Sequence, residues 1–237
     1  RPCIFEYIYF SRPDSIIKNI SVYEYRKKLG ARLAKESHVE TDLIVPVPDS
    51  GVPAAIGYAE EIKENIELGI IRNHYVGRTF IEPTQQIRSL GVKLKHSINK
   101  PLVKGKSIIL IDDSLVRGTT SVKIIKMLYE AGAKEVHLRI ASPPIKFPDF
   151  YGVDTPSKKE LLASKLSATE MRKFINAETL EFLSIEGLYK SMGYEKRNNA
   201  YPQFTDHCFT GDYPIKPVDA NNKNSSTDQL SYLSSKI

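Results

Sequence analysis

The stretch "SIILIDDSLVRGTT", residues 107–120, constrains the fold of this chain more than any other. It begins with an apolar run that is typical of a strand buried on both faces. Two adjacent aspartates end that run, and the Gly-Thr-Thr after them opens an amphipathic helix over residues 120–131. A buried strand that leads directly into a helix is the first half of a βαβ unit, which predicts a parallel sheet.

The rest of the chain continues this alternation of strands and helices. Further strands are expected at residues 7–10, 43–47, 68–71 and 136–140, and helices at residues 22–35 and 53–64. The expected fold is therefore α/β, a mostly parallel sheet flanked by helices whose last strand ends at residue 140. Beyond it, Ser-initiated segments predict short helices at residues 157–164, 167–176 and 184–191.

The 237 residues suffice for one α/β domain with a smaller addition. We expect a core over residues 1–150 that includes a long flexible loop at 73–100, because residues 73–86 show no periodicity. A helical C-terminal extension over residues 151–219 would pack on this core. The Asn- and Ser-rich residues 220–237 predict a disordered tail.

Composition excludes several classes of function. No apolar stretch reaches the ~18 residues that a membrane span needs, so no membrane partner is expected. The two cysteines, Cys3 and Cys208, lack metal-ligand spacing, which favours a reduced, cytoplasmic protein. The net charge of +6 favours anionic partners. Basic patches such as residues 26–28 lack interleaved aromatic side chains, so we interpret them as solvated faces or phosphate-attracting rims and expect no nucleic acid.

The turn after the 107–111 strand predicts a sugar-phosphate site. Such turns lie at the carboxyl edge of a parallel sheet, where open α/β sheets bind ligands. Backbone N–H groups of residues 114–120, with the hydroxyls of Thr119 and Thr120, would hold a phosphate at the helix N-terminus. Asp112 and Asp113 repel each other, so they need a partner that accepts both, such as the hydroxyls of a polyol or a magnesium ion. An acidic helix cap would explain one aspartate but not the pair.

Residues 112–120 resemble the phosphoribosyl pyrophosphate (PRPP) motif of type I phosphoribosyltransferases, and "SLVRGTT" is similar to the version found in the amidophosphoribosyltransferase family. Three further stretches agree. "PCIFEYIYFSRPDS" resembles the junction between that family's glutaminase and transferase halves, and "YVGRTFIEPTQQIR" resembles its flexible active-site loop. "SPPIKFPDFYGVDTPSKKELLA" resembles the stretch after its transferase core. The resemblance implies a type I phosphoribosyltransferase fold with helical C-terminal additions.

The resemblance also implies which residues bind PRPP. They are Asp112, Asp113, Ser114, Leu115, Val116, Arg117, Gly118, Thr119 and Thr120. The two aspartates would hold the ribose hydroxyls, and residues 114–120 would hold the 5′-phosphate. A pyrophosphate loop would comprise Asp49, Ser50 and Gly51, whose small residues expose backbone N–H groups to an anion. Mg²⁺ would be bound by Ser50, Asp112 and Asp113.

Within the flexible loop, the resemblance implies catalytic roles for Tyr75 and Arg78. A guanidinium matches phosphate oxygens in a fork, so Arg78 would stabilise the charge of the leaving pyrophosphate. The loop itself would close over the substrate and exclude water.

The reaction implied by the resemblance is displacement of pyrophosphate from PRPP by ammonia to give 5-phosphoribosylamine, the first step of de novo purine synthesis. Ammonia would come from glutamine through an N-terminal glutaminase domain or a separate glutaminase subunit, because this chain starts at Arg1 and is expected to be the transferase half. A homo-oligomer and feedback inhibition by purine nucleotides are implied as well. No iron–sulfur cluster is expected, because two cysteines cannot supply four thiolates. Two alternatives remain open, a nucleobase phosphoribosyltransferase and a PRPP-sensing regulator.

Overall fold

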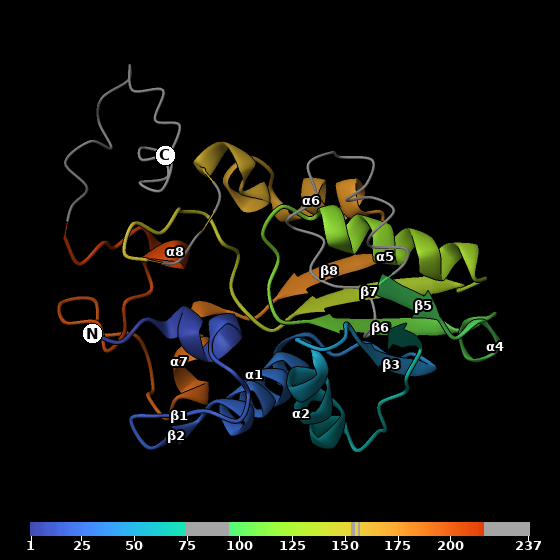
Figure 1. Ribbon diagram of the computed structural model, residues 1–237, viewed down its shortest axis with the longest axis horizontal. Helices are drawn as coiled ribbons and strands as arrows, with labels where there is room; N and C mark the ends of the chain where they lie inside the picture. Colours follow the sequence, from blue (N-terminus) through green and yellow to red (C-terminus); the bar gives the residue numbers. More distant parts are fainter. Residues whose placement is uncertain (74–94, 153–154, 156, 216–237) are drawn as a thin grey trace, which may run out of the picture.

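A computed structural model describes residues 1–73, 95–152, 155 and 157–215 of the chain. Within these residues the largest sheet has four parallel strands in the order β3-β6-β7-β8 (Figure 1). These strands are β3 (Leu43–Pro46), β6 (Ser107–Asp112), β7 (Glu135–Ile140) and β8 (Thr179–Phe182). All six residues of β6 are buried, as its apolar sequence predicts. The expected α/β fold with a parallel sheet is confirmed.

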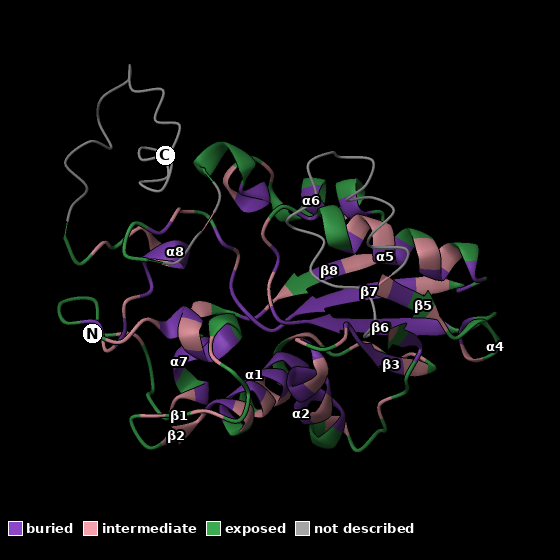
Figure 2. Ribbon diagram, in the orientation of Figure 1, coloured by how far each residue is buried: buried purple, intermediate pink, exposed green. Residues whose placement is uncertain are grey.

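Helices cover both faces of this sheet (Figure 1). They are α1 (Val22–Ser37) and α2 (Val52–Ile62) on one face, and α5 (Thr119–Glu130) and α6 (Ala168–Ile175) on the other. Successive side chains of a strand point to opposite faces, so β6 contributes to two cores. Ile109 and Ile111 join the core beneath α1 and α2, whereas Ile108 and Leu110 join the core beneath α5 and α6. Figure 2 shows the buried strands β6 and β7 between these two layers of helices.

The N-terminal segment differs from expectation. Residues 7–10 do not form a strand but belong to a π-helix, η1 (Glu6–Phe10), which is followed by a two-stranded antiparallel sheet of β1 (Ile16–Ile17) and β2 (Ile20–Ser21). The π-helix packs against α1, where Arg26 donates hydrogen bonds from Nε to the carbonyl of Tyr7 (2.9 Å) and from Nη2 to that of Ser11 (2.8 Å). Arg26 is therefore buried, with 5% of its surface exposed, and the interpretation of residues 26–28 as a solvated patch is wrong at this position.

The expected strand at residues 68–71 also needs correction. β4 (Ile70–Arg72) begins two residues later and pairs with β5 (His96–Ile98) in a separate antiparallel sheet. A short helix, α4 (Lys100–Val103), follows β5. The end of the expected flexible loop at 73–100 thus contains regular structure, while residues 74–94 lie outside the described residues.

The C-terminal extension is not purely helical. The helices α6 and α7 (Ile185–Ser191) match two of the expected segments, and a further short helix, α8 (His207–Thr210), follows. Residues 157–164 instead form two 3₁₀ turns, η3 (Lys158–Glu160) and η4 (Leu162–Ser164). The expectation that the last strand ends at residue 140 is wrong, because β8 adds to β7 in parallel with Leu180 opposite Leu138. The division of the chain at residue 150 stays a prediction, and the expected tail at 220–237 lies outside the described residues.

Among the described residues, the structure contains no helix with the length and apolar character that spanning a bilayer demands.

Candidate functional site

The two adjacent aspartates lie at the carboxyl end of the central strand. Asp112 is the last residue of β6, and both carboxylates are buried, with 8% of Asp112 and 4% of Asp113 exposed. The backbone N–H of Asp113 donates to Asp112 Oδ1 at 2.9 Å, and the carbonyl of Asp112 accepts a 2.9 Å hydrogen bond from the N–H of Ala141, just beyond β7. The backbone of the neighbouring strand therefore fixes the position of the acid pair.

Burial changes the acidity of both carboxyl groups. It raises the pKa of Asp112 well above the ordinary value, and the charge of Asp113 raises it further. Burial also raises the pKa of Asp113, but hydrogen bonds from the hydroxyls of Ser114 and Ser50 and the positive charge of Arg26 oppose this rise. Two adjacent buried carboxylates favour a ligand that brings hydroxyl donors or positive charge.

The turn after the acid pair has the features of an anion site. Gly118 immediately precedes α5 with φ of 75°, a left-handed conformation that favours glycine. Thr119 and Thr120 form the first turn of α5, and both are exposed. The first backbone N–H groups of a helix have no partner within the helix, so they are free to bind an anion there. Residues 114–120, for which the sequence predicts phosphate binding, are named the phosphate loop.

The predicted pyrophosphate loop lies beside the acid pair. The N–H of Val47 donates a 2.8 Å hydrogen bond to the carbonyl of Ile111, which directly precedes Asp112. Gly51 then passes so close to β6 that a Cβ atom there would come within 2.5 Å of the Ile111 carbonyl oxygen. Only glycine fits this approach. The loop is thereby held against the two carboxylates, and Ser50 interacts with Asp113.

Two predicted site residues use their charges for ion pairs within the protein. Asp49 of the pyrophosphate loop pairs with Arg72 at the end of β4. Arg117 of the phosphate loop pairs with Glu160 of η3, with its Nη2 3.1 Å from Glu160 Oε1. Neither partner was singled out from the sequence. For Arg72, the available signal was a basic residue directly after an expected strand.

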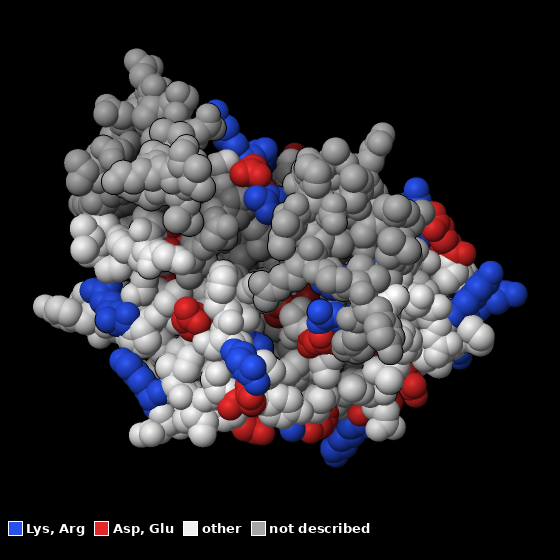
Figure 3. Space-filling model, viewed as in Figure 1, with Lys and Arg blue, Asp and Glu red and all other residues white. Residues whose placement is uncertain are grey.

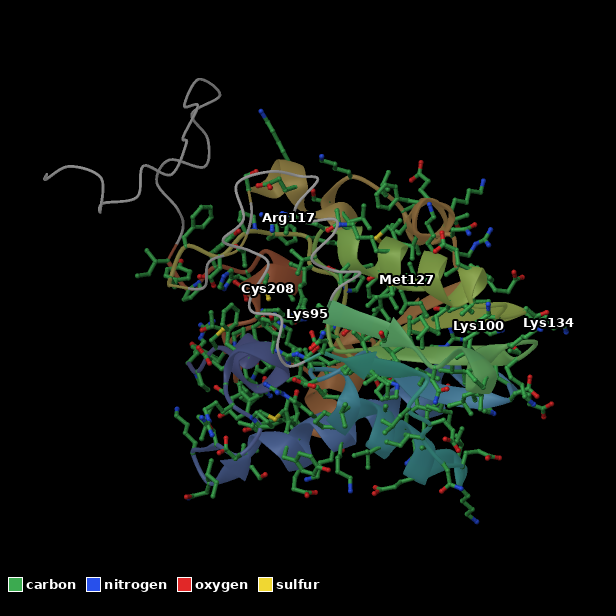
Figure 4. All side chains as sticks on the ribbon, turned by 45° about the vertical axis from the view of Figure 1, so that its right-hand side comes forward. Lys95, Lys100, Arg117, Met127, Lys134 and Cys208 are labelled. Atoms are coloured by element: carbon green, nitrogen blue, oxygen red, sulfur yellow. The ribbon has the colours of Figure 1, made fainter. Side chains whose placement is uncertain are left out.

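A cavity of about 340 Å³ brings most of the predicted residues together. It is lined by Ser50, by residues 112–120, and by residues that sequence reasoning did not assign to the site. Among the latter are Phe5, which directly precedes η1, Tyr9 and Phe10 from η1, Lys95 and His96 at β5, and Asp149, Thr155 and Cys208 from the C-terminal part. Figure 4 shows Lys95, Arg117 and Cys208 around this region, each from a different segment. Asp49 and Gly51 support the cavity without lining it, and Tyr75 and Arg78 lie outside the described residues.

The donors at the acid pair are those that a magnesium ion prefers. Asp112, Asp113 and Ser50 offer carboxylate and hydroxyl oxygens at one edge of the cavity. In the part of the chain that the structure describes, no group of three or more His, Cys, Asp or Glu side chains is arranged to hold a metal. Mg²⁺ usually takes one or two carboxylates and completes its shell with water and phosphate oxygens. The residues present therefore fit an ion that is shared with a phosphorylated ligand.

Basic side chains on the face seen in Figure 3 alternate with acidic ones rather than forming a continuous band. Among the described residues on that face, the basic side chains thus form no continuous track of the kind that a nucleic acid would follow.

A family model described as "Phosphoribosyl transferase domain" matches residues 18–141. The chain is 60% identical over 236 residues to an amidophosphoribosyltransferase of Rhizobium etli, an alignment that covers 99% of this chain and 47% of the relative. It is 54% identical over 214 residues to the amidophosphoribosyltransferase of Bacillus subtilis, covering 90% of this chain and 45% of the relative.

Among solved structures, the chain resembles the glutamine phosphoribosylpyrophosphate amidotransferase from B. subtilis complexed with ADP and GMP. The TM-score is 0.80 and the sequence identity 53%, over 90% of this chain and 46% of that one. The chain thus spans less than half the length of these relatives.

Proposed function

Because this chain belongs to the phosphoribosyl transferase domain family, we propose that it transfers the phosphoribosyl group of PRPP to ammonia, releasing pyrophosphate and forming 5-phosphoribosylamine. One observation carries this proposal. A buried acid pair lies between two glycine-containing loops, residues 49–51 and 114–120, so that a diol site is flanked by two anion sites. PRPP has this order of groups, with a phosphate on one side of its ribose hydroxyls and a pyrophosphate on the other.

Each part of the site has a role in this proposal. Asp112 and Asp113 accept hydrogen bonds from the ribose hydroxyls. The backbone N–H groups of the phosphate loop and the hydroxyls of Thr119 and Thr120 bind the 5′-phosphate. In the loop of residues 49–51, Ser50 lines the cavity and faces the pyrophosphate, whereas Asp49 and Gly51 hold the loop in place. The relatives named amidophosphoribosyltransferases support this assignment.

We propose that Ser50, Asp112 and Asp113 also hold Mg²⁺. A bound Mg²⁺ would neutralise charge on the pyrophosphate oxygens. The raised pKa of each aspartate supports this role, because a cation offsets the cost of burying two carboxylates together.

In the transfer step, the C1–O bond breaks and its electron pair leaves on pyrophosphate. The lone pair of ammonia forms the new C1–N bond, and the attached nitrogen then loses a proton to water. The chain assists by holding both ends of the substrate and by keeping water away from C1. Phe5, Tyr9 and Phe10 supply an apolar wall for this purpose. Arg78 and Tyr75 are proposed to act on the leaving pyrophosphate.

The same proposal covers the source of ammonia, the feedback inhibitors, the oligomeric state and the cellular location. The relatives are about twice as long as this chain, which supports a glutaminase domain or subunit as the source of ammonia. The nucleotide-bound relative supports purine nucleotides as feedback inhibitors of purine synthesis. We further propose a homo-oligomer, and a cytoplasmic location in keeping with the free thiols of Cys3 and Cys208.

The proposal is tested by incubating the purified chain with PRPP, Mg²⁺ and ammonium chloride and measuring released pyrophosphate. Release that depends on both ammonia and Mg²⁺ is expected. Parallel reactions replace ammonia with adenine, guanine, hypoxanthine or uracil. Release with a nucleobase but not with ammonia would identify a nucleobase phosphoribosyltransferase. PRPP binding without release under any condition would identify a PRPP-sensing protein.

A further inference from the structure

The segment that contains η3 and η4 packs directly on the phosphate loop. The N–H of Leu162 donates a 2.9 Å hydrogen bond to the carbonyl of Val116. The side chain of the same leucine lies against Gly118, because a Cβ atom built on this glycine would come within 2.8 Å of Leu162 Cδ2. The backbone and the side chain of Leu162 thus both join the C-terminal extension to the loop that carries the proposed phosphate site.

Glu160 adds a charged contact to this junction. Its Oε1 accepts a hydrogen bond from Arg117 Nε at 3.1 Å, and Arg117 Nη2 lies at the same distance. Its Oε2 accepts from the N–H of Ser157 at 3.2 Å and from the hydroxyl of Ser157 at 3.1 Å, which closes a capping box at the start of η3. One oxygen of Glu160 therefore fixes its own turn, and the other holds Arg117.

The sequence repeats this capping box ten residues later without the second contact. Ser167 and Glu170 cap α6 in the same way, with Glu170 Oε2 accepting from the Ser167 N–H at 2.8 Å and from its hydroxyl at 2.7 Å. Among the hydrogen bonds and ion pairs of the described residues, Glu170 has none with the phosphate loop. The two glutamates thus share a structural task and differ in their relation to Arg117.

We propose that Glu160 is a positioning residue for phosphate binding, acting through Arg117. Arg117 lines the cavity, so the place of its guanidinium sets the charge that a bound phosphate meets. By holding that guanidinium, Glu160 also fixes the turn at Arg117 and Gly118. This turn directly precedes α5, whose first N–H groups are proposed to bind the phosphate. This inference rests on the proposed function in that it assigns a phosphate to the loop.

The test compares two matched substitutions, Glu160→Gln and Glu170→Gln, in the full 237-residue chain. Glutamine keeps the length of the side chain and one carbonyl acceptor for the cap, but removes the charge. We expect Glu160→Gln to raise the KM for PRPP about fivefold and to change kcat less than twofold. A fivefold change in affinity is about the largest effect that a half-exposed ion pair usually has. Glu170→Gln should leave both constants within twofold of the wild type. Equal KM values for the two variants would overturn the proposal.

Two further variants separate positioning from capping. Ser157→Ala weakens the cap of η3 but keeps the pair of Glu160 with Arg117, so its KM should match the wild type. The double variant Arg117→Gln/Glu160→Gln should have the KM of Arg117→Gln alone, because Glu160 acts through Arg117. If the double variant raised the KM by the product of the two single-variant increases, the two residues would act independently and the proposal would be overturned. If Glu160→Gln does not fold, Glu160→Asp takes its place, because the shorter side chain keeps the charge but withdraws it from Arg117, and the same fivefold rise in KM is expected; a KM equal to that of the wild type would overturn the proposal.

Calorimetric binding of ribose 5-phosphate distinguishes this inference from the proposed function. A wild-type chain that binds ribose 5-phosphate about fivefold more tightly than Glu160→Gln supports the inference even if it releases no pyrophosphate, in which case only the proposed reaction fails. A wild-type chain that turns over PRPP while both glutamate variants bind ribose 5-phosphate like the wild type would overturn the inference alone. Absence of binding to the wild type would overturn the inference as well.

Discussion

The backbone N–H of Val47 donates a 2.8 Å hydrogen bond to the carbonyl of Ile111, so β3 and β6 remain in register up to the residue before the acid pair. The loop that follows β3 is therefore placed beside Asp112 and Asp113 by main-chain contacts. Substitutions that change only the charge of these side chains should alter ligand binding without disturbing the sheet.

The first prediction concerns Asp113→Asn. We expect pyrophosphate release from PRPP to fall at least ~100-fold, because the substitution removes a charge that binds the ribose hydroxyls or the metal. The far-ultraviolet circular dichroism spectrum should match that of the wild type, since the side chain lies at the carboxyl end of the strands and not within the sheet. Activity near the wild-type level would argue against the assignment of the site.

The second prediction concerns stability and pH. The pKa of Asp112 is well above its ordinary value of 3.8 because of burial and the neighbouring Asp113 charge. The folded chain thus binds this proton more tightly than the unfolded chain does, and folding stability falls as pH rises from about 4 toward the folded-state pKa. Without ligands at pH 7.5, Asp112→Asn should raise Tm by about 2–4 °C, the shift that ~1 kcal/mol produces in a chain of this size.

The measurement is differential scanning calorimetry of both proteins across this range of pH. The difference in Tm should shrink toward zero near pH 4, where the unfolded chain also carries the proton. A gain in Tm that does not depend on pH would point to a cause other than the buried charge.

The third prediction concerns the C-terminal segment. Asp206, 1% exposed, accepts hydrogen bonds from Tyr189 (2.8 Å) and Arg197 (2.7 Å from Nε to Oδ2). Asp206→Asn leaves the Arg197 guanidinium, whose side chain is 12% exposed, without this buried counter-charge. The free energy of unfolding should therefore fall by about 3 kcal/mol, the low end of the loss when one partner of a buried pair is removed. Urea denaturation measures the change. The control is Asp212→Asn, where Asp212 also pairs with Arg197 but is 44% exposed, and a loss below ~1 kcal/mol is expected. Equal losses for the two variants would contradict the prediction.

The fourth prediction concerns iron. Iron–sulfur clusters are usually bound by four thiolates, and this chain has two cysteines, Cys3 and Cys208. The purified chain should be colourless, without absorbance near 400 nm, and elemental analysis should find no stoichiometric iron. Iron and acid-labile sulfide in equal, stoichiometric amounts per chain would refute this prediction.

The acid pair and its strand could be predicted because the information is local. An apolar run, two aspartates and a glycine before a helix stand next to one another in the chain, and each is interpreted by its own chemistry. β8 could not be predicted in this way. Only Leu180 of its four residues is buried, so it lacks the apolar run of a central strand, and its strand conformation depends on pairing with β7 about 40 residues earlier.

The burial and the partners of charged side chains could not be predicted for the same reason. Arg26 sits beside two lysines in the sequence, yet it is buried because carbonyls of a distant segment accept its hydrogen bonds. Arg117 was expected to bind phosphate, and its partner Glu160 lies 43 residues further along the chain. Periodicity assigns a residue to a face of a helix, but the charges that the face will meet are decided by the tertiary fold. The roles of Tyr75 and Arg78 stay predictions.

β8 has a consequence for how the chain is synthesised. Until residues 179–182 have left the ribosome, β7 has a neighbour on only one side, and its Leu138 and Ile140 belong to a core that is still open. An unpaired strand edge with apolar faces recruits other chains, and nascent proteins are most exposed to such association. β8, the last strand among the described residues, therefore covers the free edge of β7, and ribosome-bound chains that end before it should be the ones that chaperones must shield.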